Sequence, residues 1–348
     1  MLKNLKLFLN DETIGEFAYT DSVFFFSHQI TDKFLKFYEE HFKKIKSHKI
    51  EVDGYRDFLQ PLGTNPLSIS DFLVSTKYSN ETQEKIYTSL YHLINKKSSK
   101  ILAMTNSDFY HLGTVNEVMN YYFDTNDNVS IKFRNELCFE KIKKSNFYQD
   151  KNFNTEGCLI YSYAGLKCKI GLNSILEYCY FGDNISLTTG NYTFLNNCMV
   201  NNYDGRHLKI PDNVCIHTIP VNLKKPNGDF EIKYVTIFFN RNDDLKKNYK
   251  DLSKMFFLEN QLGDNLSAIV SCLNGNSIWN LKIFRACDTM STSFLCSYNF
   301  IENFIKFKLD AIIEFLTTDK EDLFSLFDLL EHNSYEKMIE YRLEYGLI

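Results

Sequence analysis

The segment Asn106–Glu117 has residue types and spacing that suit the binding of an anion. It follows a strand-like apolar run and leads into a helix-like pattern, and Thr114 with Glu117 forms a T-x-x-E capping box. Backbone N–H groups at such a junction, here at Gly113 and Thr114, bind anions such as a sugar phosphate. Two alternatives stay open: Gly113 and Thr114 only cap the helix, and His111 is a hydrogen-bonded structural histidine.

Thr20, Asp21 and Ser22 form a second polar group, directly before the apolar run Val23–Phe26. Such a run is typical of a strand buried on both faces, so we expect a strand over residues 13–26. Strand and helix patterns then alternate to about residue 125, which predicts an α/β layer. The other expected elements are a helix opened by Thr31 or Asp32 and ending near Lys46, a strand over 50–52, a helix over 55–62 capped by Asp53, a helix from Asn80 to about Asn95, and a strand over 101–104.

From residue 157 to 200 the pattern changes to short apolar positions separated by Gly, Asn and Ser. Apolar residues recur at six-residue intervals, as in Ile175, Phe181 and Leu187, with a slip of phase near Ile170. This rhythm predicts a degenerate parallel β-helix, in which each turn stacks on the next. The alternative is an irregular sandwich.

Strand patterns continue to about residue 240, and amphipathic helix patterns fill the end of the chain. Phe300, Phe304 and Phe307 share one helical face, which we interpret as core. We therefore expect three domains: a partial α/β domain over 1–150, a parallel β-helix over 151–250 and a mainly helical region over 251–348.

The net charge of −5 argues against a nucleic-acid partner, because such proteins carry a basic surface that neutralises phosphates. No apolar run reaches the roughly 18 residues that span a bilayer, so we expect no membrane segment. The nine cysteines include no C-x-x-C pair, which favours buried reduced thiols over disulfides or zinc ligation. We expect a cytoplasmic protein.

Several phrases, taken together, resemble the GDP-fucose pyrophosphorylase family of fucose-1-phosphate guanylyltransferases. They are Ala18–Phe26, Tyr55–Gly63, Phe109–Thr114 with Glu117, Ile210–His217, and Trp279-Asn280 with Phe284. Their order and spacing match the family across most of the chain. The resemblance implies an enzyme of fucose salvage that joins GTP and L-fucose 1-phosphate to give GDP-fucose and pyrophosphate, with Mg²⁺ bridging the phosphates.

The resemblance also implies a fold and a set of site residues. The fold is a partial nucleotidyltransferase-like α/β layer, followed by a left-handed parallel β-helix and a helical C-terminus. Thr20, Asp21 and Ser22 become candidates for contacts to sugar hydroxyls. His111 stands where related enzymes often carry a metal-binding aspartate; because Mg²⁺ prefers oxygen ligands, we assign His111 to hydrogen bonding a phosphate or sugar oxygen. No catalytic residue or metal ligand is assigned.

The sequence departs from the family pattern in one respect. Met1 stands only slightly before the first phrase, so we expect a chain that lacks the nucleotide-binding half. Its glycines are too widely spaced for a G-x-G-x-x-G or P-loop phosphate cradle, and we expect no synthesis of GDP-fucose by this chain alone. The open edge of a partial sheet predicts a protein partner or self-association. The alternative function is a non-catalytic module that senses a sugar nucleotide or binds a partner.

Overall fold

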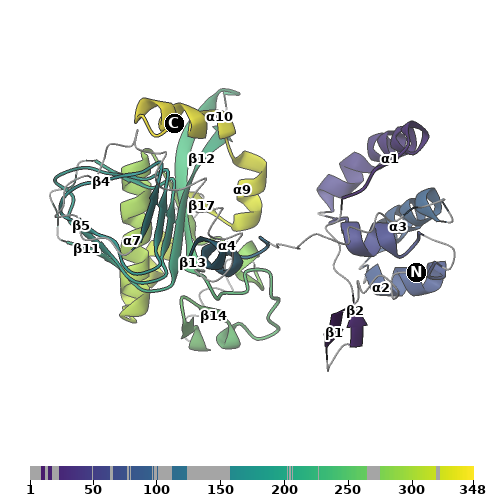
Figure 1. The fold of residues 1–348 in the computed structure, drawn as a ribbon, viewed down its shortest axis with the longest axis horizontal. Coiled ribbons are helices and arrows are strands. Elements are labelled where there is room, and N and C mark those ends of the chain that lie inside the picture. Colours follow the sequence, from purple (N-terminus) through teal and green to yellow (C-terminus); the bar gives the residue numbers. More distant parts are fainter. Residues whose placement is uncertain are drawn as a thin grey trace. The chain divides into compact units, whose positions relative to one another are not determined.

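The computed structural model divides the chain into two compact units, Met1–His111 and Leu112–Ile348 (Figure 1). Among the residues described, no helix is both long and apolar enough to cross a membrane. The structure describes residues 9–11, 15–17, 23–48, 50–62, 66–76, 78, 80–95, 97, 100, 112–123, 157–201, 203, 205, 207–225, 227–264, 275–318 and 322–348.

The described part of the first unit is mainly helical. Asn80 begins α3 by accepting a hydrogen bond from Gln83 N–H at 3.0 Å, and Asp53 begins the π-helical segment η2 by accepting one from Arg56 N–H at 2.6 Å. These two caps are confirmed, whereas the prediction that Thr31 or Asp32 opens the first helix is wrong, because α1 begins at His28. The elements are the antiparallel pair β1 (Leu9–Asp11) and β2 (Gly15–Phe17), α1 (His28–Ser47), η2 (Gly54–Leu59), α2 (Ile69–Thr76) and α3 (Glu81–Ile94).

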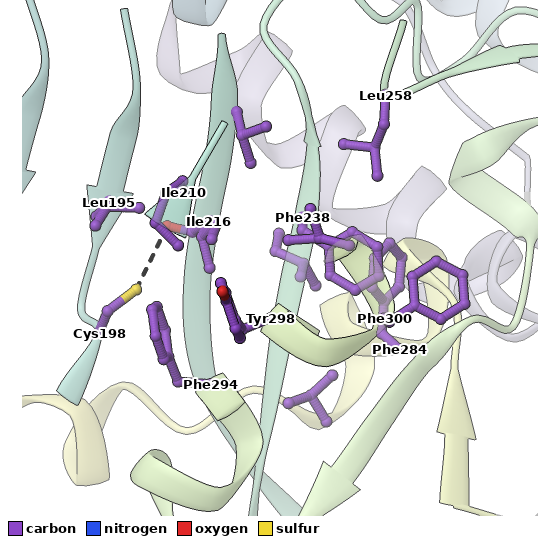
Figure 2. Close-up of a cluster of buried hydrophobic side chains, with 14 of the residues drawn as sticks. Leu195, Cys198, Ile210, Ile216, Phe238, Leu258, Phe284, Phe294, Tyr298 and Phe300 are labelled. Carbon is purple, nitrogen blue, oxygen red and sulfur yellow. Dashed lines mark hydrogen bonds between the residues drawn. The ribbon is translucent and has the colours of Figure 1, made fainter. Parts of the chain in front are cut away.

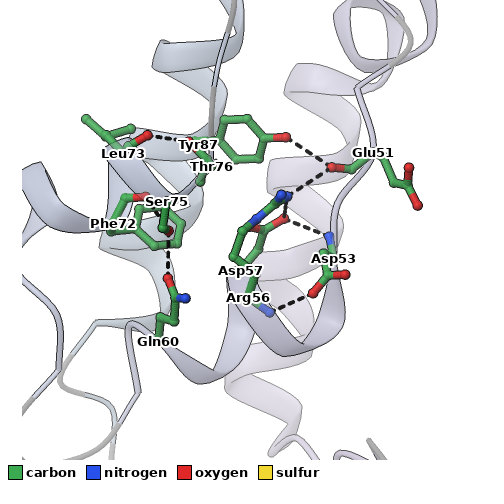
Figure 3. A network of polar contacts seen from close by, with 10 residues as sticks. All are labelled: Glu51, Asp53, Arg56, Asp57, Gln60, Phe72, Leu73, Ser75, Thr76 and Tyr87. Atoms are coloured by element: carbon green, nitrogen blue, oxygen red, sulfur yellow. Dashed lines mark hydrogen bonds and ion pairs between the residues drawn. The ribbon is translucent and has the colours of Figure 1, made fainter. Parts of the chain in front are cut away.

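Arg56 and Asp57 of η2 form an ion pair within a network of polar contacts (Figure 3). The Asp57 side chain is fully buried and accepts hydrogen bonds from Arg56 Nε at 2.5 Å and Nη2 at 2.8 Å. The backbone N–H of Asp53 donates to the same carboxylate at 2.7 Å. Asp57 raises the pKa of the Arg56 guanidinium above its usual value through this hydrogen bond. Because a buried charge without partners is costly, removing Arg56 would destabilise this unit.

The predicted strand over residues 13–26 is wrong at Val23–Phe26, although Gly15–Phe17 within this range forms β2. Val23–Phe26 has no regular structure, and Phe25 is 85% exposed. Instead, the ring centre of Phe26 lies 4.9 Å from the ring centre of Phe34 on α1. The ring centres of Phe34 and Phe58 are 5.4 Å apart. Aromatic packing against two helical segments thus replaces the pairing with neighbouring strands that the apolar run suggested.

The nucleotidyltransferase-like layer stays a prediction. Residues 50–52 have no regular structure, contrary to the strand predicted there, and the predicted strand over 101–104 lies outside the described residues. The sequence patterns did not predict α2, which packs against α3.

The second unit contains a β-solenoid of about three turns, which confirms the predicted parallel β-helix. Each turn contributes one short strand to each of three parallel sheets, so strands of successive turns lie in register. The strands are β3 (Cys158–Ile160), β4 (Tyr163–Ala164), β5 (Cys168–Lys169), β6 (Ile175–Glu177), β7 (Tyr180–Phe181), β8 (Leu187–Thr189), β9 (Phe194–Asn196), β10 (Met199–Val200) and β11 (Leu208–Ile210).

The last turn leads into a longer mixed sheet that helices cover. Strand β12 pairs in parallel with β9 and antiparallel with β13, and the sheet continues through β16 to β17. The strands are β12 (Val214–Lys224), β13 (Phe230–Asn240), the small pair β14 (Phe256–Phe257) and β15 (Asn260–Gln261), β16 (Phe284–Cys287) and β17 (Leu323–Phe324). The helices are α4 (Val115–Phe123), α7 (Met290–Ile305), α8 (Leu309–Thr317), α9 (Leu326–His332) and α10 (Tyr335–Glu344).

One hydrophobic core joins the solenoid to the C-terminal helices. Inside it, Leu195 and Ile216 lie on the side of Phe294, whereas Phe300 of α7 packs on Phe238 of β13 (Figure 2). The ring of Phe294 meets that of Phe181 edge-on at 5.6 Å. The predicted core face of this helix is confirmed for Phe300 and Phe304, whereas Phe307 is exposed beyond the helix end. The domain boundaries at residues 150 and 250 stay predictions.

Close backbone approach between turns gives a first prediction. A methyl group added at Gly171 would lie 2.3 Å from the carbonyl oxygen of Gly190 in the next turn, so Gly171→Ala must push two backbones apart. We expect it to lower the free energy of unfolding by about 1–3 kcal/mol in urea denaturation. Lys209→Ala, at an exposed side chain of β11, serves as the control and should change it by less than about 0.5 kcal/mol. Equal effects of the two variants would contradict the role of Gly171.

Candidate functional site

Helix α4 begins with a reciprocal cap that the sequence predicted. The carboxylate oxygen Oε2 of Glu117 accepts hydrogen bonds from Gly113 N–H at 3.0 Å, Thr114 N–H at 2.8 Å and Thr114 Oγ1 at 2.9 Å. Thr114 Oγ1 in turn accepts one from Glu117 N–H at 3.2 Å. The capping box is confirmed, and the two backbone N–H groups predicted to bind an anion already hold the carboxylate of Glu117.

The apolar face of α4 packs on the outside of the first solenoid sheet. Met119 is almost fully buried in a cluster with Cys158, Ile160 and Ile175 from β3 and β6. These strand residues point away from the solenoid interior, so without α4 they would expose apolar surface. This packing holds α4 against the solenoid.

A groove of about 300 Å³ lies beside α4, within the size range of ligand pockets. Its lining residues are Met119, Asn120 and Phe123 of α4 with Asn173 and Tyr192 of the solenoid corners. Asn173 and Tyr192 have φ values of 53° and 54°, the left-handed region that a bulky residue such as tyrosine seldom adopts. The solenoid corners thus hold an aromatic ring and an amide toward the same groove.

Two polar side chains near α4, Arg241 and Asn116, each bury an atom that has no partner among the described residues. The Arg241 guanidinium lies over the Tyr192 ring at 4.4 Å, and Asn116 Nδ2 donates to Asn242 Oδ1 at 2.9 Å. Within the described part of the chain, Arg241 Nε and Asn116 Oδ1 are buried and have no hydrogen-bond partner. Arg241 Nε is a donor and Asn116 Oδ1 is an acceptor.

A second polar cluster lies on the same solenoid sheet. Glu177, Asn196 and His217 occupy equivalent positions in successive turns, and Asn196 Nδ2 donates to the Glu177 carboxylate. Burial raises the pKa of Glu177 and lowers the pKa of His217 to about 4. Arg342 of α10 lies 3.6 Å from the ring centre of Tyr178, and its Nε donates to Asn197 Oδ1 at 3.3 Å. We interpret this cluster as the attachment of α10 to the solenoid.

The structure brings together only part of the predicted site. Gly113 and Thr114 lie at the start of α4, whereas Thr20, Asp21, Ser22 and His111 lie outside the described residues. Sequence reasoning missed Asn116, Tyr192 and Arg241. A signal for Tyr192 existed, because it follows the same kind of turn as Asn173 in the preceding coil of the repeat.

The α4 cap gives a prediction that does not depend on function. Thr114→Ala removes the hydroxyl that caps Glu117 N–H, so it should lower the free energy of unfolding of the second unit by about 1 kcal/mol. Chemical denaturation measures this loss. Thr114→Ser keeps the hydroxyl and is the control; a loss of similar size in both variants would show that the hydroxyl is not responsible.

The lowered pKa of His217 predicts a dependence of stability on pH. The unfolded histidine binds a proton near pH 6.5, but the folded one only near pH 4, so its contribution is complete above pH 6.5 and is lost as the pH falls toward 4. The loss approaches about 1.4 kcal/mol per pH unit. Urea denaturation between pH 4.5 and 7.5 should show that the free energy of unfolding changes less with pH in His217→Gln than in the wild type. The same pH dependence in both proteins would contradict the lowered pKa of His217.

Comparisons with known proteins agree with the resemblance seen in the sequence. A family model described as the fucose pyrophosphorylase domain matches residues 4–290. The chain is 28% identical to human fucose-1-phosphate guanylyltransferase over 350 residues, which cover 94% of this chain and 52% of the relative. The mouse protein of the same name is 25% identical over 347 residues, covering 94% and 53%.

The chain thus spans about half the length of the curated relatives that it matches. No solved structure matches it. Because the family model covers most of its length, the chain belongs to the fucose pyrophosphorylase family.

Proposed function

We propose that this chain binds the sugar-phosphate substrate of a fucose-1-phosphate guanylyltransferase reaction. In that reaction the phosphate of L-fucose 1-phosphate attacks the α-phosphorus of GTP, which gives GDP-fucose and releases pyrophosphate. The two curated relatives carry this enzyme name, and the alignment with them covers 94% of the chain. The groove beside α4 is the observation in the structure that carries the proposal.

The groove has the chemistry that a monosaccharide needs. The CH groups of a sugar ring pack on aromatic faces, and Phe123 and Tyr192 both line the groove. Sugar hydroxyls both donate and accept, and Asn120 and Asn173 offer amides in the groove. Among the described residues, no acidic side chain lines the groove, and the Arg241 guanidinium over the Tyr192 ring would attract a phosphate.

The residues assigned from the sequence in the first unit stay predictions of their own. They are Thr20, Asp21 and Ser22 as contacts to sugar hydroxyls, and His111 as a hydrogen-bond partner of a phosphate or sugar oxygen. His111 directly precedes the second unit, in which Gly113 and Thr114 begin the approach to α4. A phosphate at Gly113 and Thr114 would have to displace the carboxylate of Glu117 from their N–H groups.

The family implies Mg²⁺, which neutralises charge on the phosphates when it is bound. Among the described residues, no three His, Cys, Asp or Glu side chains converge as a metal site requires. No step of the proposal depends on a bound metal ion. The proposed work of the described residues is to bind and orient the sugar phosphate.

Calorimetry with the purified chain tests the proposal. We expect L-fucose 1-phosphate to bind, and Arg241→Gln to weaken this binding by roughly 5- to 150-fold, since it removes about 1–3 kcal/mol of hydrogen bonding to a charged group. Lys247→Gln is the matched control, because Lys247 lies over Tyr249 at 5.1 Å and does not line the groove. It should leave the affinity unchanged.

The outcomes separate the functions. No binding of L-fucose 1-phosphate, or equal affinities of wild type and Arg241→Gln, would contradict the proposal. We expect no pyrophosphate above a no-enzyme control when the chain alone meets GTP, Mg²⁺ and L-fucose 1-phosphate. Binding of GDP-fucose that exceeds binding of L-fucose 1-phosphate would favour the non-catalytic sensing module.

A further inference from the structure

The turn that follows β13 carries two side chains that interact near α4. The Arg241 guanidinium lies over the Tyr192 ring at 4.4 Å. The next residue, Asn242, accepts a hydrogen bond from Asn116 of α4 at 2.9 Å. The backbone N–H of Arg241 donates to the carbonyl oxygen of Asn213 at 2.8 Å. Asn213 occupies the corner that follows Tyr192 in the next solenoid turn, so this hydrogen bond ties the turn to the solenoid.

Asn240, the last residue of β13, connects this turn to Glu259. The Asn240 side chain is almost fully buried, and its Oδ1 accepts a hydrogen bond from Asn242 N–H at 2.9 Å. Its Nδ2 donates to Glu259 Oε1 at 3.0 Å. The same Glu259 oxygen accepts a hydrogen bond from Asn213 Nδ2 at 3.0 Å. Glu259 therefore joins the residue before Arg241 to the residue that the Arg241 backbone contacts.

Asp243 holds Glu259 in place from the other side of the turn. Its Oδ2 accepts hydrogen bonds from Asn240 N–H at 2.8 Å and from Leu258 N–H at 3.2 Å. Leu258 and Glu259 form the tight turn between β14 and β15, with φ values of 50° and 65°. Non-glycine residues adopt this left-handed conformation at a cost, so such a turn persists where the surrounding contacts hold it.

We propose that Glu259 is a positioning residue for the sugar phosphate, because it holds Arg241 over Tyr192 through Asn213 and Asn240. The inference rests on the proposed function of the groove beside α4. Among the described residues, Arg241 Nε has no hydrogen-bond partner. The Tyr192 ring and the backbone of the turn therefore set the position of the guanidinium, and Glu259 fixes that backbone at both of its neighbours.

NMR of the full chain with ¹⁵N-labelled arginine tests the positioning without a ligand. The ring current of an aromatic ring shifts a proton above it upfield, and Arg241→Gln identifies the Nε–H signal of Arg241 by its loss. We expect this signal to move toward the position of an ordinary arginine in Glu259→Ala. It should stay in place in Glu259→Gln, because the side-chain oxygen of glutamine still accepts hydrogen bonds from Asn213 and Asn240.

Calorimetry with L-fucose 1-phosphate tests the consequence for binding. We expect Glu259→Ala to weaken binding by roughly 2- to 13-fold, the loss of about one net hydrogen bond. In the Arg241→Gln background the same change should alter the affinity by less than about 2-fold, because no guanidinium is left to position. Glu259→Gln should keep the wild-type affinity. Asp251→Ala is the matched control, since Asp251 instead accepts from Ser253 N–H at 3.1 Å and begins η4 (Leu252–Lys254).

The two measurements separate this inference from the proposed function. An Arg241 signal that does not move in Glu259→Ala would overturn the inference, whether or not the ligand binds. A loss of affinity that is equally large in the Arg241→Gln background would also overturn it, as would Glu259→Gln behaving like Glu259→Ala. If the signal moves but the wild type does not bind L-fucose 1-phosphate, the proposed function is overturned and Glu259 still positions Arg241.

Discussion

The stacking of one solenoid turn on the next is the constraint on which the second unit depends. Backbone hydrogen bonds such as Ile175 N–H to Thr193 O at 2.8 Å hold successive turns in register, and the approach at Gly171 leaves no space for a side chain. This register decides which outward-facing residues stack on each other. It therefore forms the apolar surface on which α4 packs and the stack of Glu177, Asn196 and His217 near α10. The groove beside α4 exists because the corners at Asn173 and Tyr192 follow the same register.

The sequence predicted the elements whose signals are local. Caps at Asp53, Asn80 and Thr114 place a hydrogen-bonding side chain a few residues from its target, and each cap is confirmed. The six-residue rhythm revealed the solenoid because every turn repeats the same short pattern. The family assignment also followed from local phrases, and Ile210–His217 is now seen as the corner that joins β11 to β12.

Features that depend on contacts between distant segments were not predictable in this way. The run Val23–Phe26 has the composition of a buried strand, and only the positions of Phe34 and Phe58 show that its rings pack on helical segments. Arg241 reaches Tyr192, and Asn116 reaches Asn242, across long stretches of chain. No spacing within one segment indicates such pairs, so the groove became visible only with the fold.

The cap of α4 has a consequence for any anion that approaches this loop. Glu117 is tethered to the helix, so its carboxylate is present at the Gly113 and Thr114 N–H groups at an effective concentration of the order of millimolar or more. A free phosphate competes with this intramolecular rival for the same two donors. An anion that binds these N–H groups must therefore be more concentrated, or bind more tightly, than the Glu117 carboxylate that the chain itself supplies.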